Sequence, residues 1–378
     1  MIDIQKVNPG IALFGKIQKQ NDADILNMCN EGSYCDGNEK LLHVIQNSFV
    51  SNTNIHAPLD GYYPLRENIS RLIENDYSFV YRPDSEITIT AGAASAISTA
   101  ISAFIKEGDQ VIIFEPSYFT YAPVVLANGG RPTYIKLKLP DFHIDWDEVQ
   151  KGITVNTRMI IINSPHNPTG KILTAQDMER LTRIVNGTKI IILSDESFDK
   201  IIYEGYEHQS IARFPKLAER SIVVFSFGKS LLSEGWKLGF CLAPERLSET
   251  FRKFHYLFSM SVNLPFQVTI SDLLGRKSIF DGKAKYLERK RNLLIKGLKN
   301  SKFKLNSSSG TYFQIVNYAE LSEEKEVDFC NQLLEKHRLA VMPLSHFYHD
   351  AVDNKYLRIC FSVPDETIEK ALAILNSL

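Results

Sequence analysis

The chain has 378 residues, of which 44% are hydrophobic and 23% are charged. Its 43 basic and 44 acidic residues leave a formal charge of −1, so composition gives no reason to expect attraction to nucleic acid or to a membrane surface. No apolar run reaches about 18 residues and the start lacks the apolar core of a signal peptide, so we expect a soluble cytoplasmic protein.

Short β-branched runs alternate with helix-like segments through the middle of the sequence. Strands are predicted at 86–90, 110–114, 133–137, 159–163, 189–194, 221–225 and 238–242. Residues 93–106 and 175–185 carry apolar side chains at helical spacing. The alternation predicts a mainly parallel sheet flanked by helices, in a large domain over residues 45–265.

The last third of the chain predicts a second, smaller domain. Residues 280–301 are rich in Lys, Arg and Leu and predict a long helix, so we expect residues 266–300 to link the two domains. Further strands are predicted at 311–316, 339–342 and 356–361. They alternate with helix-like segments, which indicates a small α/β domain over residues 301–378.

Neither cysteine nor histidine spacing indicates a metal site. The five cysteines are Cys29, Cys35, Cys241, Cys330 and Cys360, an odd number without a Cys-x-x-Cys pair. The nine histidines lack the paired helical spacing of zinc ligands. We therefore expect reduced thiols and no bound metal.

Three of the apolar runs lead directly into polar residues. Lys229 follows the run 221–225, Asp195 follows 189–194, and Asn163 ends 159–163. Strand ends in open α/β sheets face the ligand crevice, where desolvation favours Schiff-base chemistry at a lysine. A lysine, a carboxylate and an amide in one crevice suit pyridoxal phosphate. The alternative is that Lys229 is a solvated loop lysine, as most lysines are.

The order and spacing of several short motifs resemble the fold-type I pyridoxal-phosphate aminotransferases, and within them the methionine and kynurenine aminotransferase-like branch. The resemblance covers nearly the whole chain and is carried by residues 90–94, 115–118, 163–168, 194–196, 226–229, 235–239, 309–313 and 357–359. It implies an α/β fold-type I transferase, with a large domain built on a mainly parallel mixed sheet and a small C-terminal α/β domain. It also implies an N-terminal arm, residues 1–44, packed on the small domain, and a homodimer with shared active sites.

The resemblance assigns the cofactor phosphate to the start of the predicted helix at 93. Gly92, Ala93 and Ala94 would bind the phosphate, with further contacts from the Ser226 hydroxyl and the Lys237 ammonium. Free N–H groups and the helix dipole suit an anion there, although plain helix capping is the alternative. Most relatives carry a hydroxyl residue where this chain has Ala94, and many carry arginine where it has Lys237.

Further roles follow from the same resemblance. Tyr118 would stack on the pyridine ring, Asp195 would hold the ring nitrogen protonated, and Asn167 would bond the phenolic oxygen. Arg358 would bind the α-carboxylate of the substrate through its fork of donors. The alternatives are an ordinary buried or interface tyrosine at 118 and a structural ion pair at Arg358.

Three positions depart from the family pattern. Phe198 stands where relatives have a tyrosine that bonds the phenolic oxygen. His56 stands where a tyrosine of the neighbouring subunit reaches the phosphate. Glu31, followed by Gly and Ser, replaces the Gly-Phe-Pro common in this branch. These departures leave the substrate open.

The resulting hypothesis is a homodimeric aminotransferase that moves the amino group of an L-amino acid to a 2-oxo acid. Lys229 would form the Schiff base and move the proton. The branch indicates methionine, glutamine, aromatic or kynurenine-like donors. The departures motivate a second hypothesis, a β-elimination lyase or a specialised oxidase or cyclase. A third is a catalytically silent relative, against which the presence of Lys229, Asp195, Asn167 and Arg358 argues.

Overall fold

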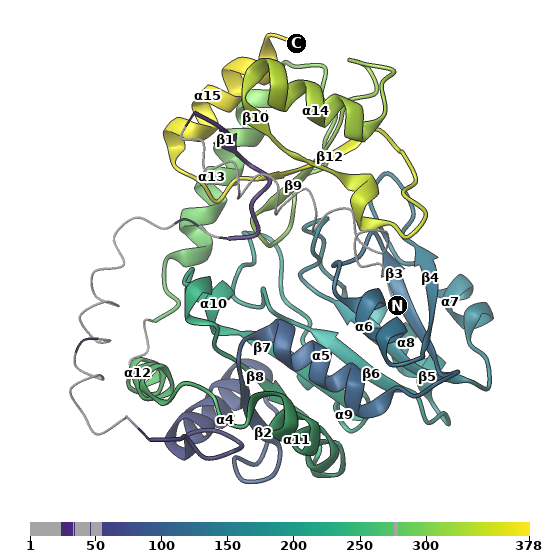
Figure 1. Cartoon of the computed structure of the whole chain (residues 1–378), viewed down its shortest axis with the longest axis vertical. Helices are drawn as coiled ribbons and strands as arrows, with labels where there is room; N and C mark the ends of the chain where they lie inside the picture. The colour runs from purple at the N-terminus through teal and green to yellow at the C-terminus, as the bar shows by residue number, and fades with distance from the viewer. Residues whose placement is uncertain (1–23, 33, 35–45, 47–54, 276–278) are drawn as a thin grey trace.

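A mixed seven-stranded sheet forms the larger part of the molecule, shown in the lower half of Figure 1. The computed structural model describes residues 24–32, 34, 46, 55–275 and 279–378. Strand order is β2-β8-β7-β6-β5-β3-β4, in which β8 is antiparallel to both of its neighbours and the remaining pairs are parallel. The α/β fold class and the mainly parallel mixed sheet are therefore confirmed.

The strands of this sheet begin and end within two residues of the predicted runs. They are β2 (Ile87–Thr90), β3 (Gln110–Glu115), β4 (Arg131–Lys136), β5 (Thr157–Asn163), β6 (Ile191–Asp195), β7 (Ser221–Ser226) and β8 (Gly239–Leu242). The central strands are apolar along nearly their whole length because helices cover both faces of the sheet. Ile160 and Ile192 lie in one apolar cluster, and Ile161 and Leu193 lie in another.

Helices cover the two faces and the edge of the sheet (Figure 1). Those associated with the sheet are α4 (Tyr63–Tyr77), α5 (Ala93–Phe104), α6 (Tyr121–Ala127), α7 (Trp146–Gly152), α8 (Ala175–Val185), α9 (Pro215–Ala218), α10 (Phe227–Ser230), α11 (Glu245–Ser259) and α12 (Leu264–Leu274). Helix α5 packs on β6, β7 and β8, and α11 packs on α5. The buried residues of α8 join the cluster on the opposite face of the sheet.

A smaller part of the molecule, at the top of Figure 1, contains the end of the chain. Its elements are β9 (Phe313–Asn317), β10 (Leu339–Ala340), β11 (Met342–Pro343), β12 (Tyr356–Cys360), α13 (Lys283–Leu298), α14 (Glu326–His337) and α15 (Asp365–Asn376). Strands β11, β12 and β9 form an antiparallel sheet, while β10 pairs with β1 (Leu26–Asn27) from near the start of the chain. This brings residues 26–32 over the centre of the molecule.

The prediction of one strand over residues 339–342 was wrong, because the structure has two strands there. Residues 339–342 form parts of two strands, because the chain changes partner at Val341: β10 pairs with β1, whereas β11 pairs with β12. The predicted helix over 280–301 is α13 and begins after Gly282, which adopts a left-handed φ of 76°. Most of the expected arm, residues 1–44, lies outside the described residues.

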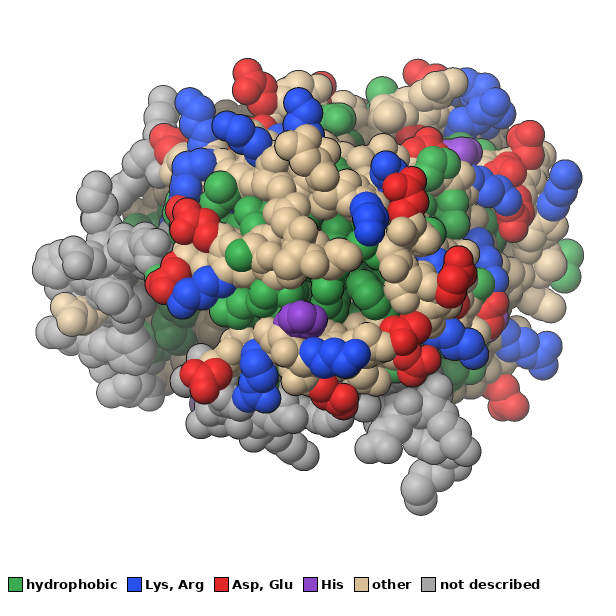
Figure 2. All heavy atoms as spheres, turned by 90° about the horizontal axis from the view of Figure 1, so that it is seen from above, with side chains coloured by type: hydrophobic (Ala, Val, Ile, Leu, Met, Phe, Trp, Pro, Cys, Tyr) green, Lys and Arg blue, Asp and Glu red, His purple; other side chains and the backbone are tan. Residues whose placement is uncertain are grey.

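The described surface has no dominant sign of charge on the face shown from above in Figure 2. Lys, Arg, Asp and Glu side chains are interspersed there, in keeping with the formal charge of −1. Within the described residues, no helix combines the length and apolar character needed to cross a membrane.

Candidate active site

A cavity of about 350 Å³ lies at the carboxyl ends of the central strands. Of the residues predicted from sequence, its lining includes Gly92, Ala93, Ala94, Tyr118, Asn167, Asp195, Phe198, Ser226, Lys229 and Lys237. Residues 30–32 form another part of the wall. Segments that are far apart in sequence therefore meet at one site, which the strand-end argument predicted.

The start of α5 forms one end of the cavity. Gly92 precedes this helix with φ of 80°, and no side chain caps the helix start. The first N–H groups of a helix have no intrahelical acceptor and carry the positive end of its dipole. A Cβ on Gly239 would lie 2.5 Å from the carbonyl oxygen of Phe225 and 3.1 Å from the nitrogen of Ala93. The absence of a side chain at Gly239 therefore allows β8 to approach the helix start.

Two polar side chains stand beside this helix start. Lys237 lies at a left-handed position, with φ of 48°, and its ammonium has no acceptor among the described residues. Ser226 caps α10 by accepting a 3.3 Å hydrogen bond from the N–H of Lys229. Together with the N–H groups of α5, these side chains form a set of donors suited to a phosphate.

Lys229 points into the middle of the cavity and is four-fifths buried. Its Nζ donates a 2.6 Å hydrogen bond to the carbonyl oxygen of Glu31 and another to the hydroxyl of Tyr312. The Glu234 carboxylate lies 3.7 Å away. Lys229 is therefore a partly buried amine held by directed contacts, and the solvated-loop alternative is wrong.

Tyr312 and Glu234 are site residues to which sequence analysis gave no role. The Tyr312 hydroxyl lies 2.7 Å from the Glu31 carbonyl oxygen and 3.0 Å from Oε1 of Glu234. Burial raises the pKa of Tyr312, and the nearby Glu234 carboxylate raises it further. Tyr312 belongs to a motif that carried the family resemblance, but its contact with Lys229 depends on β9 packing over the cavity.

Asp195 lies at the end of β6, at the bottom of the cavity. Its Oδ2 accepts a 2.6 Å hydrogen bond from the Tyr121 hydroxyl, while Oδ1 accepts from the N–H and the hydroxyl of Ser197. Burial raises the pKa of the Asp195 carboxyl, and the bonds from Ser197 and Tyr121 oppose that rise. A buried carboxylate with three donors is a fixed partner for a cationic group.

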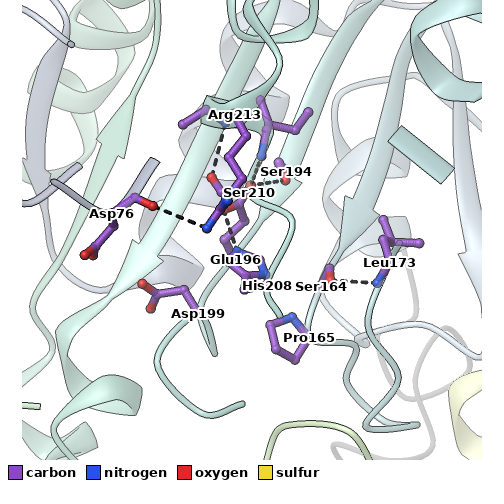
Figure 3. Close-up of polar contacts among 12 residues, drawn as sticks. Asp76, Ser164, Pro165, Leu173, Ser194, Glu196, Asp199, His208, Ser210 and Arg213 are labelled. Atoms are coloured by element: carbon purple, nitrogen blue, oxygen red, sulfur yellow. Dashed lines mark hydrogen bonds and ion pairs between the residues drawn. The ribbon is translucent and has the colours of Figure 1, made fainter. Parts of the chain in front are cut away.

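A buried polar network holds the chain just beyond Asp195, as Figure 3 shows. The carboxylate of Glu196 accepts hydrogen bonds from the Ser194 hydroxyl at 2.9 Å and from the N–H of Ile211 at 3.0 Å. Nε2 of His208 lies 2.8 Å from the other oxygen of the same carboxylate. These contacts fix the exit of β6 and hence the position of Asp195.

The loop after β5 is fixed by Asn163. Its side chain donates to the carbonyl oxygens of Asp195 at 2.8 Å and Pro165 at 3.2 Å, and it accepts from the N–H of Asn167 at 2.8 Å. Asn167 is thereby held facing the cavity. Its Nδ2 lies 3.2 Å from Oε2 of Glu31, and its Oδ1 accepts a 3.0 Å bond from Arg358.

Arg358 lies on β12 with no exposed surface, sandwiched between aromatic rings. Its guanidinium carbon is 4.0 Å from the ring centre of Phe313 and 4.8 Å from that of Phe347. It forms an ion pair with the Glu31 carboxylate and donates a 3.2 Å bond to the Cys29 carbonyl oxygen. The ion pair that sequence analysis left open is therefore present, and its partner is Glu31.

The remaining predicted residues have distinct positions. Tyr118 stands edge-on to Tyr121 with ring centres 5.6 Å apart, and Phe198 stands edge-on to Tyr312 at 5.2 Å. His56 is exposed, with Nδ1 3.4 Å from the Ser261 hydroxyl, and is not part of the cavity wall in its own chain. Its expected contact concerns a neighbouring subunit.

The groups of the cavity fit pyridoxal phosphate. The uncapped helix start, Ser226 and Lys237 form an anion site at one end, while the buried carboxylate of Asp195 provides a partner for a protonated ring nitrogen. Lys229 stands among the same lining residues and would supply the amine. Position 94 adds no hydroxyl to this set, because it is occupied by Ala94.

Residues 23–375 match the family model described as aminotransferase class I and II. Methionine aminotransferase from Escherichia coli is 35% identical over 344 residues, which cover 91% of this chain and 89% of the relative. A probable N-succinyldiaminopimelate aminotransferase from Mycobacterium tuberculosis is 30% identical over 356 residues, again covering 91% and 89%. The solved structure of YbdL from Escherichia coli, described with a methionine aminotransferase function, has a TM-score of 0.92 at 33% identity and covers 98% of this chain and 97% of its own.

Proposed function

The chain belongs to the class I and II aminotransferases, and we propose that its amino donor is an L-amino acid with an uncharged side chain, of the methionine, glutamine, aromatic or kynurenine-like type. Pyridoxal 5′-phosphate is the cofactor, and the reaction is transamination with a 2-oxo acid. When bound, the cofactor supplies a carbonyl carbon for amine exchange and a ring that withdraws electrons from the substrate's Cα.

The observation that carries this proposal is that Lys229 and Asp195 line one cavity and that Arg358 lies directly behind its wall, paired with Glu31. The helix start at Gly92, with Ser226 and Lys237, would hold the phosphate, and Asp195 would keep the ring nitrogen protonated. Tyr118 would lie against the ring and Asn167 would bond its phenolic oxygen. Phe198 adds an apolar wall without a hydroxyl.

Lys229 would move the proton between the substrate's Cα and the cofactor. To do so its amine must alternate between neutral and protonated forms. The Tyr312 hydroxyl and the Glu31 carbonyl oxygen accept hydrogen bonds from the protonated form, and Glu234 lies close enough to stabilise its charge. These contacts place Nζ inside the cavity and orient it.

The charges of the cavity wall support a donor with an uncharged side chain. Among the described residues that line the cavity, the cations are Lys229 and Lys237. In this proposal Lys229 moves the proton and Lys237 binds the phosphate, so neither is left for a charged substrate side chain. Arg358 lies behind the wall and would bind the α-carboxylate. A second carboxylate on the substrate would meet Glu31, Asp195 and Glu234 without a cation of its own.

A single-turnover screen tests the donor class. The holoenzyme is mixed with each of the twenty amino acids without an acceptor, and the visible absorption of the bound cofactor is followed. Methionine, glutamine or aromatic amino acids are expected to change the spectrum faster than aspartate or glutamate. The opposite ranking would overturn the proposed donor class while leaving the family assignment intact.

The role of Arg358 is tested with paired substrates. Arg358→Ala is expected to weaken a reacting amino acid by about 10- to 150-fold, the equivalent of a charged hydrogen bond of about 1.5–3 kcal/mol. The corresponding amine, which lacks the carboxylate, should be affected much less. Equal losses for the amino acid and the amine would make Arg358 a structural residue.

We also propose that the chain forms a homodimer in the cytoplasm. Large exposed apolar side chains occur at 55–63 and 256–260, and these segments meet where His56 contacts Ser261. An exposed apolar surface of this kind is typical of an interface. Sedimentation of the holoenzyme at dimer mass, and its loss in Leu257→Asp, would support the dimer.

The proposed location in the cytoplasm is supported by the thiols. The four described cysteines are free and buried, as suits a reducing compartment.

The elimination and oxidase alternatives rest on the departures at Phe198, His56 and Glu31. Product analysis distinguishes them, because a transaminase stops after one turnover when no 2-oxo acid is supplied. Continued release of ammonia or of a 2-oxo acid product without an acceptor would favour elimination or oxidation instead.

A further inference from the structure

The substrate-side arginine is already paired with a carboxylate of its own chain. Nη1 of Arg358 forms an ion pair with Oε1 of Glu31, while Oε2 of Glu31 lies 3.2 Å from Nδ2 of Asn167. Glu31 also lines the cavity. A carboxylate thus stands between the arginine and the cavity, in the position that the proposed function assigns to the substrate's carboxylate.

The ion pair with Glu31 leaves one hydrogen-bond donor of the Arg358 guanidinium, Nε, without an acceptor among the described residues. The Arg358 side chain has no exposed surface. Glu31 therefore engages one edge of the guanidinium and does not form a bidentate pair. A buried donor without an acceptor is unfavourable, so the arrangement favours a ligand that completes the fork.

The contacts of Glu31 differ between its backbone and its side chain. Its carbonyl oxygen accepts hydrogen bonds from Lys229 and Tyr312, at 2.6 and 2.7 Å, which hold the backbone in place. Its carboxylate is held only by Arg358 and Asn167 among the described residues, and 16% of the side chain is exposed. The carboxylate can therefore rotate away without movement of the backbone.

We propose that the Glu31 carboxylate is an internal competitor that occupies Arg358 until the substrate's carboxylate displaces it. This inference rests on the proposed function, which places the substrate's carboxylate at Arg358. Two carboxylates on one buried guanidinium would repel each other, so binding of the substrate requires Glu31 to leave. Glu31 is thus a specificity-determining residue: it selects substrates whose carboxylate binds Arg358 well enough to displace it.

The cost of this competition is set by the fraction of molecules in which Arg358 is free. The apparent dissociation constant equals the intrinsic constant divided by that fraction. If Arg358 is free in about one molecule in ten, removal of the competing carboxylate tightens binding about tenfold. A neutral ligand, which does not need Arg358, gains nothing.

The experiment measures binding to the holoenzyme of 3-phenylpropionate, an inert carboxylate, and of 3-phenylpropionamide, its neutral counterpart. Glu31→Gln keeps the size of the side chain and removes its charge. We expect this variant to bind 3-phenylpropionate at least about tenfold more tightly and 3-phenylpropionamide within about twofold of wild type. In an Arg358→Ala background, Glu31→Gln should have no such effect, because there is no site to compete for.

The outcomes are distinct. Unchanged or weaker binding of 3-phenylpropionate in both Glu31→Gln and Glu31→Ala would overturn the inference. If Glu31→Gln does not fold, the result for Glu31→Ala decides alone. Equal tightening of the amide would also overturn it, since the effect would not involve the carboxylate. If no amino acid alters the cofactor spectrum of wild type, the proposed function fails. If amino acids react but Glu31 variants bind the carboxylate no better, only this inference fails.

Discussion

The hydroxyl of Tyr121 donates a 2.6 Å hydrogen bond to Oδ2 of Asp195, the carboxylate at the bottom of the cavity. Together with the bonds from Ser197, it stabilises a negative charge that burial disfavours. Burial outweighs these bonds, so the folded protein without cofactor disfavours the ionised form of Asp195.

Asp195→Asn is expected to stabilise the cofactor-free protein at pH 8 while lowering transaminase activity at least about tenfold, because a charged hydrogen bond contributes about 1.5–3 kcal/mol. Burial raises the folded pKa of Asp195 above its unfolded value. The Asp195 carboxyl therefore makes its full contribution to folding stability only below the pKa that it has in the unfolded chain. That contribution is lost as the pH rises through the higher pKa of the folded protein. The gain in Tm for Asp195→Asn should shrink as the pH falls toward the usual Asp pKa of about 3.9.

Tyr121→Phe serves as the matched control, since it removes a bond that lowers the pKa of Asp195. Its cofactor-free Tm at pH 8 is expected to fall, in the direction opposite to Asp195→Asn. Thermal unfolding at pH 5 and pH 8 measures both. A lower Tm for Asp195→Asn at pH 8 would contradict the assignment of Asp195 as a destabilised buried carboxylate.

Lys229→Ala is expected to remove turnover, with a loss of about 10³-fold or more, because both the amine and the proton carrier disappear. The groups proposed to bind the phosphate, at Gly92, Ser226 and Lys237, remain, so the protein should still bind the cofactor. Steady-state kinetics and an equilibrium titration with pyridoxal phosphate measure the two properties. Near wild-type kcat in this variant would remove the central assignment.

Tyr312→Phe is expected to lower kcat about tenfold through loss of the hydroxyl that contacts Lys229 Nζ. Binding of 3-phenylpropionate should stay within about twofold, since the Glu31–Arg358 pair is kept and Lys229 still holds the Glu31 carbonyl oxygen. Tyr318→Phe is the control, because the Tyr318 hydroxyl bonds the Glu324 carbonyl oxygen at 2.9 Å and lies outside the cavity wall. An equal fall in kcat for both variants would indicate a general effect on folding.

Phe198→Tyr adds a hydroxyl to the cavity wall, at the position where the family resemblance leads us to expect a tyrosine. The new donor is expected to lower the pH midpoint of the holoenzyme's visible absorption by about one to two units, since a charged hydrogen bond contributes about 1.5–3 kcal/mol and one unit corresponds to about 1.4 kcal/mol. Because Asn167 also lines the wall, we expect a shift at the lower end of this range. A pH titration without substrate measures it, and an unchanged or raised midpoint would place Phe198 away from the ring oxygen.

Much of the fold follows from local sequence pattern. Helix α8 was predicted at its observed bounds, residues 175–185, because its apolar spacing is a local signal. The structure adds a capping box at Thr174, which is local as well. The runs that became β5 and β6 each contain four consecutive apolar residues, 159–162 and 190–193, as buried parallel strands require. Residues 339–342 were predicted less well, since pairing partners far along the chain decide where each strand ends.

The sequence by itself determined the central sheet, the helix start at Gly92 and the location of Lys229 and Asp195 at or just after the ends of strands, because strand ends and helix starts carry local signals. Only the tertiary structure decided which side chains these residues meet. Tyr121 reaches Asp195 from 74 residues away, and Arg358 meets Glu31 because β1 pairs with β10 beside β12. Such contacts depend on how separate elements pack, and no spacing within a single segment specifies them.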